Sequence, residues 1–264
     1  MEIFINNLIV KEKNTDNQLL KELNFRLNEK QIQGIIGPSG SGKTTLLHVL
    51  AGVSHPTLQV HGSFTWTKNG EKEKEEFFSN THSLRKQFSM GYIPQNAMNV
   101  FDPIETMQHQ LMETFCENGW SKKEANEKIS CILNDFQLDQ SILTRYPHEL
   151  SGGILQRCTI GIALQLKPQI LLADEPTSSV DQEVKQIILD EFKEYSRKNN
   201  AMIVLTTHDY SVIQQLCDQL LILENGCCHY MGDTKTAEQE AAFYSEIKNI
   251  HEKMETYVKE LLNE

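Results

Sequence analysis

The part of the chain that most constrains its fold is the string Gly37-Pro38-Ser39-Gly40-Ser41-Gly42-Lys43-Thr44, which fits the pattern G-x-x-x-x-G-K-[ST]. Glycines let backbone N–H groups turn inward and approach an anion closely, and a following helix adds the positive end of its dipole. An apolar stretch at 32–36 precedes the string, and 44–51 has helical composition. This context predicts a loop for nucleotide phosphates, with Lys43 near the β- and γ-phosphates and the Thr44 hydroxyl on Mg²⁺.

A second string places two carboxylates directly after a buried strand. The apolar residues 170–173 lead into Asp174 and Glu175, and open α/β sheets bind ligands at such strand ends. Adjacent carboxylates there are costly to desolvate without a cation. We therefore assign Asp174 to Mg²⁺, largely through water, and Glu175 to the attacking water as general base. The alternative is a capping pair, because the residues from Glu175 to Ser178 can also open a helix.

Composition limits the classes of protein to consider. The chain has 264 residues, of which 39% are hydrophobic and 23% charged, which is typical of a soluble globular protein with a full core. Its net charge of −11 argues against broad binding to nucleic acid, which needs a basic face. No apolar run approaches the roughly 20 residues that cross a bilayer, and residues 1–4 do not resemble a signal peptide. Any membrane-spanning part of a transport system is then expected on another chain.

The cysteines indicate a reducing, cytoplasmic compartment. There are six of them, without a C-x-x-C pair. Cys227, Cys228 and His229 resemble metal ligands, but Asn225 and Gly226 before them indicate a hairpin turn between apolar runs. Neighbours on a strand point to opposite faces, so these three side chains do not converge on one ion. We expect a structural role for them.

The rest of the chain alternates between strand and helix patterns. Strands are expected at 4–10, 19–27, 60–67 and 92–94, whereas the mixed charges of 68–76 predict a solvated loop. Residues 104–136 have a helical pattern, with a capping box at Ser121 and Glu124. Strands at 169–173 and 201–206 then alternate with helices at 181–198 and 209–217, which predicts a parallel sheet with crossover helices. The tail, 234–264, is polar and helical, with Phe243, Ile247, Ile250 and Met254 in one apolar stripe.

Five strings together resemble the ATP-binding cassette ATPases in order and spacing. They lie at 37–45, 150–156, 171–177, 179–181 and 207–209. The resemblance covers the chain to about residue 232. It implies an α/β fold: a P-loop NTPase (RecA-like) core with an N-terminal antiparallel β subdomain and an inserted α-helical subdomain at about 97–167. The nucleotide-binding domain would then be 1–232, and 233–264 a C-terminal helical tail.

The same resemblance implies roles for single residues. Thr45 completes the phosphate loop. Gln95 is similar to the glutamine that senses the γ-phosphate and Mg²⁺ and links to the transmembrane partner. Three residues resemble the signature loop that contacts the γ-phosphate bound by the opposite subunit: Ser151, Gly152 and Gly153.

Two further residues follow the carboxylate pair. Asp181 resembles the residue that bridges the two halves of a cassette dimer. His208 resembles the switch histidine that holds the γ-phosphate, and it directly follows the strand at 201–206 and Thr207. A lone histidine after a strand is often structural, and its place downstream of Asp174 and Glu175 favours the functional interpretation.

Two details indicate a subfamily. The string 147–157 has the apolar Ile154 where most cassettes have Gln, which is similar to the peptide/nickel importers. Gln95, Met98 and Pro103 fit the Gln-loop of that group, although Asn96, Ala97, Phe101 and Asp102 depart from it. The chain lacks the Cys-rich extension of many peptide-type members and looks like the shorter nickel- or metallophore-type members. It also has Lys11, Glu12 and Lys13 near the expected place of an aromatic residue that stacks on adenine.

These features predict an ATP- and Mg²⁺-dependent ATPase subunit of an importer for peptides, nickel or metal–metallophore complexes. The expected partners are transmembrane permease subunits, a second ATPase subunit that is either a non-identical paralogue or a second copy, and an extracellular solute-binding protein, without nucleic acid. The expected location is the cytoplasmic face of the cell membrane. The alternatives are a soluble cassette ATPase acting on DNA or ribosomes, and a small-molecule P-loop kinase, which would not need a signature loop. The cargo stays open, because it does not touch this subunit.

Overall fold

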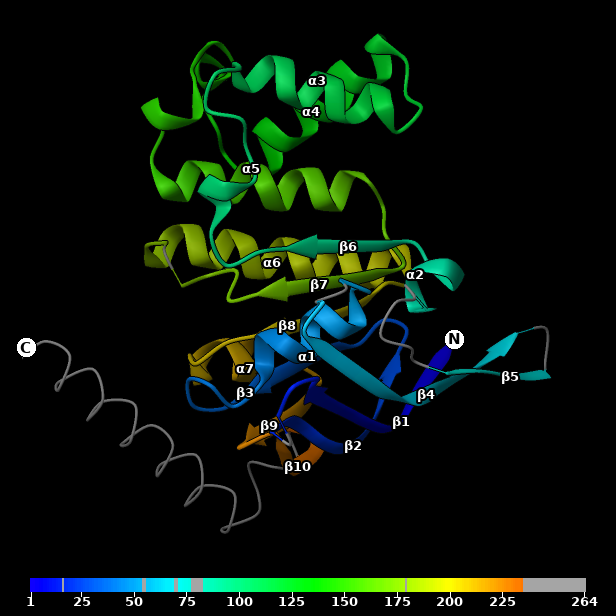
Figure 1. Cartoon of the computed structure of the whole chain (residues 1–264). Helices are drawn as coiled ribbons and strands as arrows, with labels where there is room; N and C mark the ends of the chain where they lie inside the picture. Colours follow the sequence, from blue (N-terminus) through cyan, green and yellow to red (C-terminus); the bar gives the residue numbers. More distant parts are fainter. Residues whose placement is uncertain (16, 54–55, 69–70, 77–82, 179, 235–264) are drawn as a thin grey trace, which may run out of the picture.

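A computed structural model of the chain contains two β-sheets and a group of helices, and describes residues 1–15, 17–53, 56–68, 71–76, 83–178 and 180–234 (Figure 1). The predicted tail at 234–264 lies outside the described residues, except for its first residue. The expected α/β class and the N-terminal antiparallel sheet are confirmed.

The antiparallel sheet has the strand order β2-β1-β4-β5. Along β2 the apolar Leu23, Phe25 and Leu27 are buried, whereas Asn24 and Arg26 between them are exposed, which is the alternation of a half-buried strand. The four strands are β1 Glu2–Glu12, β2 Gln18–Asn28, β4 Leu58–Lys68 and β5 Glu71–Glu76.

The solvated loop expected at 68–76 is corrected by the structure. Residues Glu71–Glu76 form β5, which pairs antiparallel with β4. An edge strand needs a partner on one side only, so alternating Lys and Glu side chains are compatible with it and protect the free edge from other chains. The pairing with β4 therefore decides the structure of this charged segment, and its own composition does not.

The second sheet has the order β10-β9-β3-β8-β7-β6 and is parallel, except that β10 pairs antiparallel with β9. Alternate residues of β7 reach opposite sides of the sheet. Ile170 and Leu172 join the core around α1, while Leu171 and Ala173 join the core around α5 and α6. Its strands are β3 Ile32–Ile36, β6 Met90–Ile93, β7 Ile170–Asp174, β8 Met202–Thr206, β9 Gln219–Glu224 and β10 Cys227–Asp233.

Helices cover both faces of this parallel sheet, as the alternating pattern predicts. α1 Lys43–Leu50 lies between the two sheets and buries Leu46, Leu47 and Leu50 there (Figure 1). The helices α6 Gln182–Asn199 and α7 Tyr210–Leu216 pack with the opposite core. A short helix, α2 Ser83–Gln87, precedes β6.

Between β6 and β7, where every residue is described, the chain forms helices and no strand. Figure 1 shows α3 and α4 at the end of the molecule away from the antiparallel sheet. The predicted capping box at the start of α4 is confirmed, because Ser121 and Glu124 exchange backbone and side-chain hydrogen bonds. The elements are η1 Ala97–Asn99, α3 Met107–Glu117, α4 Lys122–Asp135, η2 Gln140–Thr144, η3 Pro147–Glu149 and α5 Gly152–Gln165.

The parallel strands bring distant segments to one edge of the sheet. β3 ends at the glycine-rich loop, β7 ends at Asp174, β8 ends just before Thr207 and β6 ends two residues before Gln95. Because parallel strands share one direction, these carboxyl ends lie together, which is where such sheets place their ligands.

Candidate functional site

The loop between β3 and α1 has glycine where other residues do not fit. A Cβ atom on Gly37 would stand 1.9 Å from the carbonyl oxygen of Leu223 in β9. Gly42 has a φ of +104° immediately before α1, a backbone conformation that glycine adopts at low cost. α1 begins at Lys43, so the free N–H groups and the positive dipole end of this helix face the loop. The predicted strand, loop and helix are confirmed, and their geometry suits an anion.

Lys43 is held inside the loop. Its Nζ donates hydrogen bonds to the carbonyl oxygens of Gly37 at 2.8 Å and Pro38 at 3.1 Å. Burial lowers the pKa of Lys43, and the nearby carboxylates of Glu175 and Asp174 oppose that effect. The ammonium therefore already lies in the field of both carboxylates, at a place where the negative charge of a bound phosphate would favour its charged form.

Asp174 is 3% exposed and joins the loop to the strand β8. Its Oδ2 accepts a hydrogen bond from the Thr44 hydroxyl at 2.8 Å, and its Oδ1 accepts one from the Thr206 hydroxyl at 2.6 Å. A buried carboxylate beside a hydroxyl is the kind of oxygen donor set that Mg²⁺ takes, with phosphates and water completing the coordination. In the described part of the chain no group of three His, Cys, Asp or Glu residues could hold a metal ion by itself. The oxygens of Thr44 and Asp174 thus fit Mg²⁺ that arrives with a nucleotide.

Glu175 stands at the centre of the site, and both its oxygens have partners. Its Oε1 lies 3.0 Å from Nδ1 of His208, and its Oε2 accepts a hydrogen bond of 3.2 Å from the Gln95 amide. The residue has a φ of +47°, which is uncommon without glycine. Its backbone N–H donates to the hydroxyl of Thr206 at 3.0 Å and so helps to fix this conformation.

The contact between Glu175 and His208 favours the charged form of each. Burial alone would raise the pKa of Glu175, but the hydrogen bond from His208 and the positive charges of His208 and Lys43 outweigh it and lower the pKa. The hydrogen bond to Glu175 raises the pKa of His208 against the opposing effect of burial. The carboxylate is therefore ionised and able to accept a proton at neutral pH, once a water molecule replaces one of its two partners.

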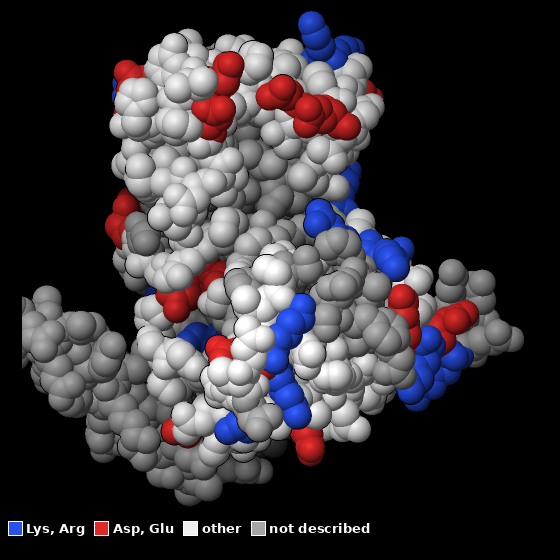
Figure 2. Space-filling view, in the orientation of Figure 1, with Lys and Arg blue, Asp and Glu red and all other residues white. Residues whose placement is uncertain are grey.

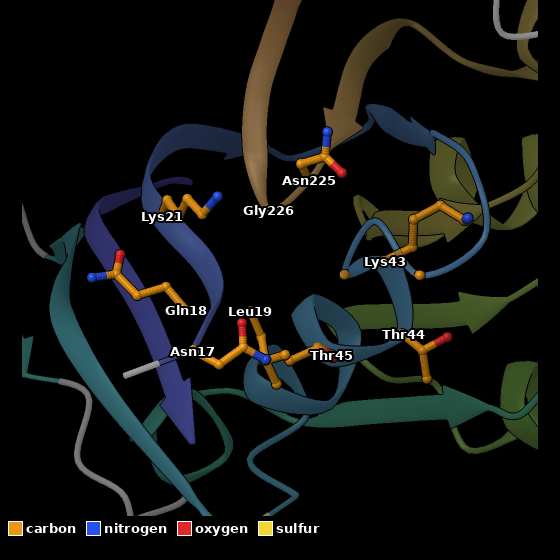
Figure 3. A pocket seen from close by; sticks show the side chains of 11 residues that line it. Asn17, Gln18, Leu19, Lys21, Lys43, Thr44, Thr45, Asn225 and Gly226 are labelled. Carbon is orange, nitrogen blue, oxygen red and sulfur yellow. The ribbon is translucent and has the colours of Figure 1, made fainter. Parts of the chain in front are cut away.

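An open cleft of about 530 Å³ continues from the phosphate loop. Figure 3 shows the residues from β2 on one side of this cleft, Lys43 and Thr44 on the other, and the β9–β10 turn above them. That turn is the predicted hairpin, which is confirmed. The residues of the nucleotide cleft, as we call it, are Asn17, Gln18, Leu19, Lys21, Gly40, Gly42, Lys43, Thr44, Thr45, Asn225 and Gly226.

The sequence does not identify the part of this cleft that lies beyond the phosphate loop. Gly226 donates its N–H to the Ser41 carbonyl oxygen at 3.1 Å and accepts from the N–H of Lys21 at 2.8 Å, so the turn is fixed between the loop and β2. No aromatic residue is among the residues described as lining the cleft, and Lys11, Glu12 and Lys13 are not among them either. The sequence Asn225-Gly226 predicts the turn itself. It does not predict that the turn lies beside β2 and the phosphate loop, because these segments meet only through the packing of the two sheets.

The residues resembling a signature loop lie apart from the nucleotide cleft. The Ser151 side chain caps α5 by accepting from the N–H of Ile154 at 3.4 Å. A Cβ on Gly152 would meet nothing within 4 Å, and one on Gly153 would only reach the Val180 side chain at 3.8 Å. None of these three residues is among those described as lining the cleft. The amino end of α5 is therefore open to another molecule.

Asp181 occupies a similar position on α6. It is exposed, and its Oδ1 caps the helix by accepting from the N–H of Val184 at 2.9 Å. A second, smaller cleft of about 250 Å³ lies beside it and is lined by residues that include Glu175, Gln182 and His208. The structure thus brings Lys43, Thr44, Gln95, Asp174, Glu175 and His208 together, and leaves Asp181 and the amino end of α5 on outer surfaces.

The described surface shows no continuous basic band in the view of Figure 2, where acidic side chains gather over the helical end of the molecule. Among the helices of the described ranges, none combines the length and the apolar composition that a membrane crossing requires.

Comparison with known sequences identifies one family over most of the folded part. Residues 20–178 match the family described as ABC transporter. The metal-staphylopine import system ATP-binding protein CntD of Staphylococcus aureus is 29% identical over 84% of this chain and 82% of that protein. The oligopeptide transport ATP-binding protein OppD of Salmonella typhimurium is 34% identical over 78% of this chain, which spans 62% of that protein. OppD of Haemophilus influenzae is 33% identical over 89% of this chain and 72% of its own length.

A relative whose name states a different role is equally similar. The lipoprotein-releasing system ATP-binding protein LolD of Buchnera aphidicola is 36% identical over 75% of this chain and 83% of that protein. Among solved structures, an ATP-binding subunit of an ABC transporter superposes with a TM-score of 0.73 at 21% identity, covering 94% of this chain and 100% of the other. A dimeric cassette, MJ0796, solved with ADP and Pi, gives 0.72 at 24% identity, covering 88% of this chain and 98% of that chain. At these identities the structures support the fold alone.

Proposed function

The chain belongs to the ABC transporter family, and from that premise we propose that it powers an importer for peptides, nickel or metal–metallophore complexes. Membership makes it an ATP-binding cassette ATPase. We further propose that residues 1–232 form the nucleotide-binding domain, with a helical subdomain at about 97–167, and that 233–264 form a C-terminal helical tail. Asp233, at the start of that range, is the last residue of β10.

The observation that carries the proposal is the meeting of Thr44, Asp174 and Glu175 at one strand edge. Lys43 would leave the carbonyl oxygens of its own loop for the β- and γ-phosphates, while the loop N–H groups hold the phosphate oxygens. The Thr44 hydroxyl and the Asp174 carboxylate would hold Mg²⁺, which would supply positive charge against the phosphates when bound. We assign Mg²⁺ contact to Gln95 as well.

Glu175 and His208 then divide the chemical work. The carboxylate of Glu175 orients the attacking water and takes its proton, which requires an ionised group at neutral pH. The imidazole of His208, released from Glu175 or shared with it, donates a hydrogen bond to the γ-phosphate. Gln95, bonded to the same carboxylate, reports the state of the site to the segment that follows it.

A complete site needs a second cassette. The amino end of α5, with Ser151, Gly152 and Gly153, offers unpaired helix N–H groups to a phosphate, but it lies outside the nucleotide cleft of its own chain. Two cassettes arranged head to tail would place the α5 end of each on the nucleotide of the other, with Asp181 between them. The partner is a non-identical paralogue or a second copy of this chain.

Exposed apolar side chains in the segment that follows Gln95, and one near it at Tyr146, support docking to permease subunits. Met98, Val100 and Ile104 are 55%, 44% and 78% exposed, and Tyr146 is 39% exposed. The N–H of Met107 donates to the Arg145 carbonyl oxygen at 3.0 Å, so the two segments lie side by side. Large apolar groups gathered on a surface favour a protein partner. We therefore place the protein at the cytoplasmic face of the membrane, with an extracellular solute-binding protein in the same system.

Purification from its own cells tests this proposal. A tagged chain, isolated from detergent-solubilised membranes, is expected to carry a permease pair and a second ATPase, and cells lacking it should lose uptake of peptides, nickel or a metallophore complex. A complex that releases lipoproteins, as the name of LolD describes, would replace the importer proposal. Recovery with ribosomes or DNA, without a membrane protein, would contradict transport altogether.

A further inference from the structure

Lys185 is a buried lysine in the second turn of α6. Its backbone N–H donates to the carbonyl oxygen of Asp181 at 2.9 Å, so it lies one turn after the residue that the proposed function puts between two cassettes. Its side chain is only 8% exposed. A buried ammonium is costly unless it is paired and hydrogen-bonded, so the partners of Lys185 identify what holds it there.

Those partners belong to the turn that follows His208. The Nζ of Lys185 lies 2.5 Å from Oδ2 of Asp209 and donates to the Ser211 hydroxyl at 2.8 Å. Asp209 is the residue directly after His208. Its other oxygen, Oδ1, accepts from the backbone N–H of Ser211 at 2.8 Å and so caps the seven-residue helix α7. One carboxylate therefore holds the start of α7 and binds it to α6.

The charge of Asp209 supports this arrangement. Burial would raise the pKa of Asp209, but the hydrogen bonds from Lys185 and Ser211 and the charge of Lys185 outweigh it and lower the pKa. The carboxylate of Asp209 is therefore ionised at neutral pH and available to the Lys185 Nζ. The Lys185 side chain is buried but that of Asp209 is 43% exposed, so the pair is only half-buried and contributes little net stability. A positioning role is accordingly the more specific explanation for this one.

The pair also connects two functional positions. Asp181 stands at the exposed start of α6, and His208 contacts Glu175 at 3.0 Å. Lys185, Asp209, His208 and Glu175 all line the second cleft of about 250 Å³. A shift of the first turns of α6 would thus be transmitted through Lys185 to the turn that carries the histidine.

We propose that Lys185 is a positioning residue for hydrolysis. Its ion pair with Asp209 aligns His208 with Glu175. This alignment depends on the position of the start of α6, which the partner cassette fixes. The proposal rests on the proposed cassette function, since it assumes a partner at Asp181. Lys185 is not among the residues lining the nucleotide cleft, so it acts on turnover and not on nucleotide affinity.

The test compares kcat and KM for ATP in the complex reconstituted with its partner subunits. Lys185→Met is expected to lower kcat at least about tenfold, because small misplacement of reacting groups is costly, with KM changed less than about twofold. Lys185→Arg, which keeps the charge, should recover most of the loss. The matched control is Lys193→Met. Lys193 also links α6 to the end of α7, through the Gln215 carbonyl oxygen at 3.4 Å, but it is not among the residues lining the second cleft with His208. This variant should therefore keep the wild-type kcat.

A second variant keeps the test decisive if Lys185→Met folds poorly. Asp209→Asn should lower kcat to a similar degree, and the double variant should be no slower than either single one, because both remove the same contact. Wild-type kcat in Lys185→Met, additive losses in the double variant, or an equal loss in Lys193→Met would each overturn the proposal. Stimulation of the wild-type ATPase by its partner subunits tests the proposed cassette function separately. A failure of the Lys185 proposal can therefore be distinguished from a failure of the proposed function.

Discussion

Glu175 and His208, 33 residues apart in the chain, lie side by side, with Oε1 of the carboxylate 3.0 Å from Nδ1 of the imidazole. The second oxygen of Glu175 is bonded to Gln95. The expected base is thus held by the two residues expected to sense the γ-phosphate. Before Glu175 can bind a water molecule, one of these two hydrogen bonds must break. A movement of Gln95 or His208 would therefore control whether the carboxylate is available.

Removal of this base is the first prediction. Glu175→Gln should slow hydrolysis at least about 10²-fold, the usual share of a general base, while ATP affinity stays near that of the wild type. Single-turnover hydrolysis and equilibrium nucleotide binding separate the two effects. Glu127→Gln, an exposed change on α4, is the control. Unchanged turnover in the assembled complex would remove Glu175 from the role.

The second prediction concerns the cation of the phosphate loop. Lys43→Ala should abolish measurable ATP binding, because Lys43 is the only cation in the string Gly37–Thr44 and would contact the β- and γ-phosphates. Titration with a fluorescent ATP analogue measures the affinity, with Lys123→Ala on the exposed face of α4 as the control. Wild-type affinity in Lys43→Ala would defeat the assignment.

The third prediction follows from the absence of aromatic residues among those described as lining the nucleotide cleft. Stacking of a base on an aromatic ring is typically worth about 1–3 kcal/mol. Without it, we expect weak discrimination between ATP and GTP, measured by competition for the same site. A preference for ATP above about 100-fold, about 2.7 kcal/mol, would show that another group in the cleft reads the base.

The fourth prediction is a pH dependence of stability at the joint between α6 and α4. Burial, with the charges of Asp135 and Glu194, raises the pKa of Glu191 to about 7 from an ordinary 4.5. The unfolded chain then loses this proton at lower pH than the folded one. Stability therefore falls as pH rises from about 4.5 to 7 and stays reduced above that.

Glu191→Gln removes this titration. Its melting temperature should exceed that of the wild type at pH 8, and the difference should shrink towards pH 5. Thermal unfolding at several pH values measures it, beside Glu117→Gln, an exposed change on α3. A difference that does not depend on pH, or none at pH 8, would contradict the effect of Asp135 and burial on Glu191.

The sequence predicts the unit of β3, the glycine-rich loop and α1 well, because residues close together in the chain determine its structure. The short strand β3 has three isoleucines among its five residues and leads directly into Gly37, and α1 begins at Lys43, where the motif requires a helix. β7 and the carboxylates after it follow from the same kind of pattern. The sequence does not predict that β7 lies next to β8, which is known only from the strand order of the folded sheet.

What the sequence does not predict depends on partners far along the chain. Glu71–Glu76 is a strand because β4 pairs with it, although its charges are typical of a loop. Lys185 is one of many polar residues on α6, and its burial becomes visible only when Asp209, 24 residues later, is placed against it. Leu19 and Asn225 come from different sheets and meet in one cleft through packing alone.

The ATPase activity of the purified chain, alone and in the reconstituted complex, tests the central claim most directly. The amino end of α5 is not among the residues lining the nucleotide cleft of its own chain, so each site is completed only by association. A membrane scaffold lowers the entropic cost of that association by holding two cassettes close together. We expect slow turnover that rises with concentration for the lone chain, and strong stimulation by permease and partner ATPase subunits. Full turnover at nanomolar concentration, indifferent to those subunits, would contradict the account and favour a self-sufficient ATPase.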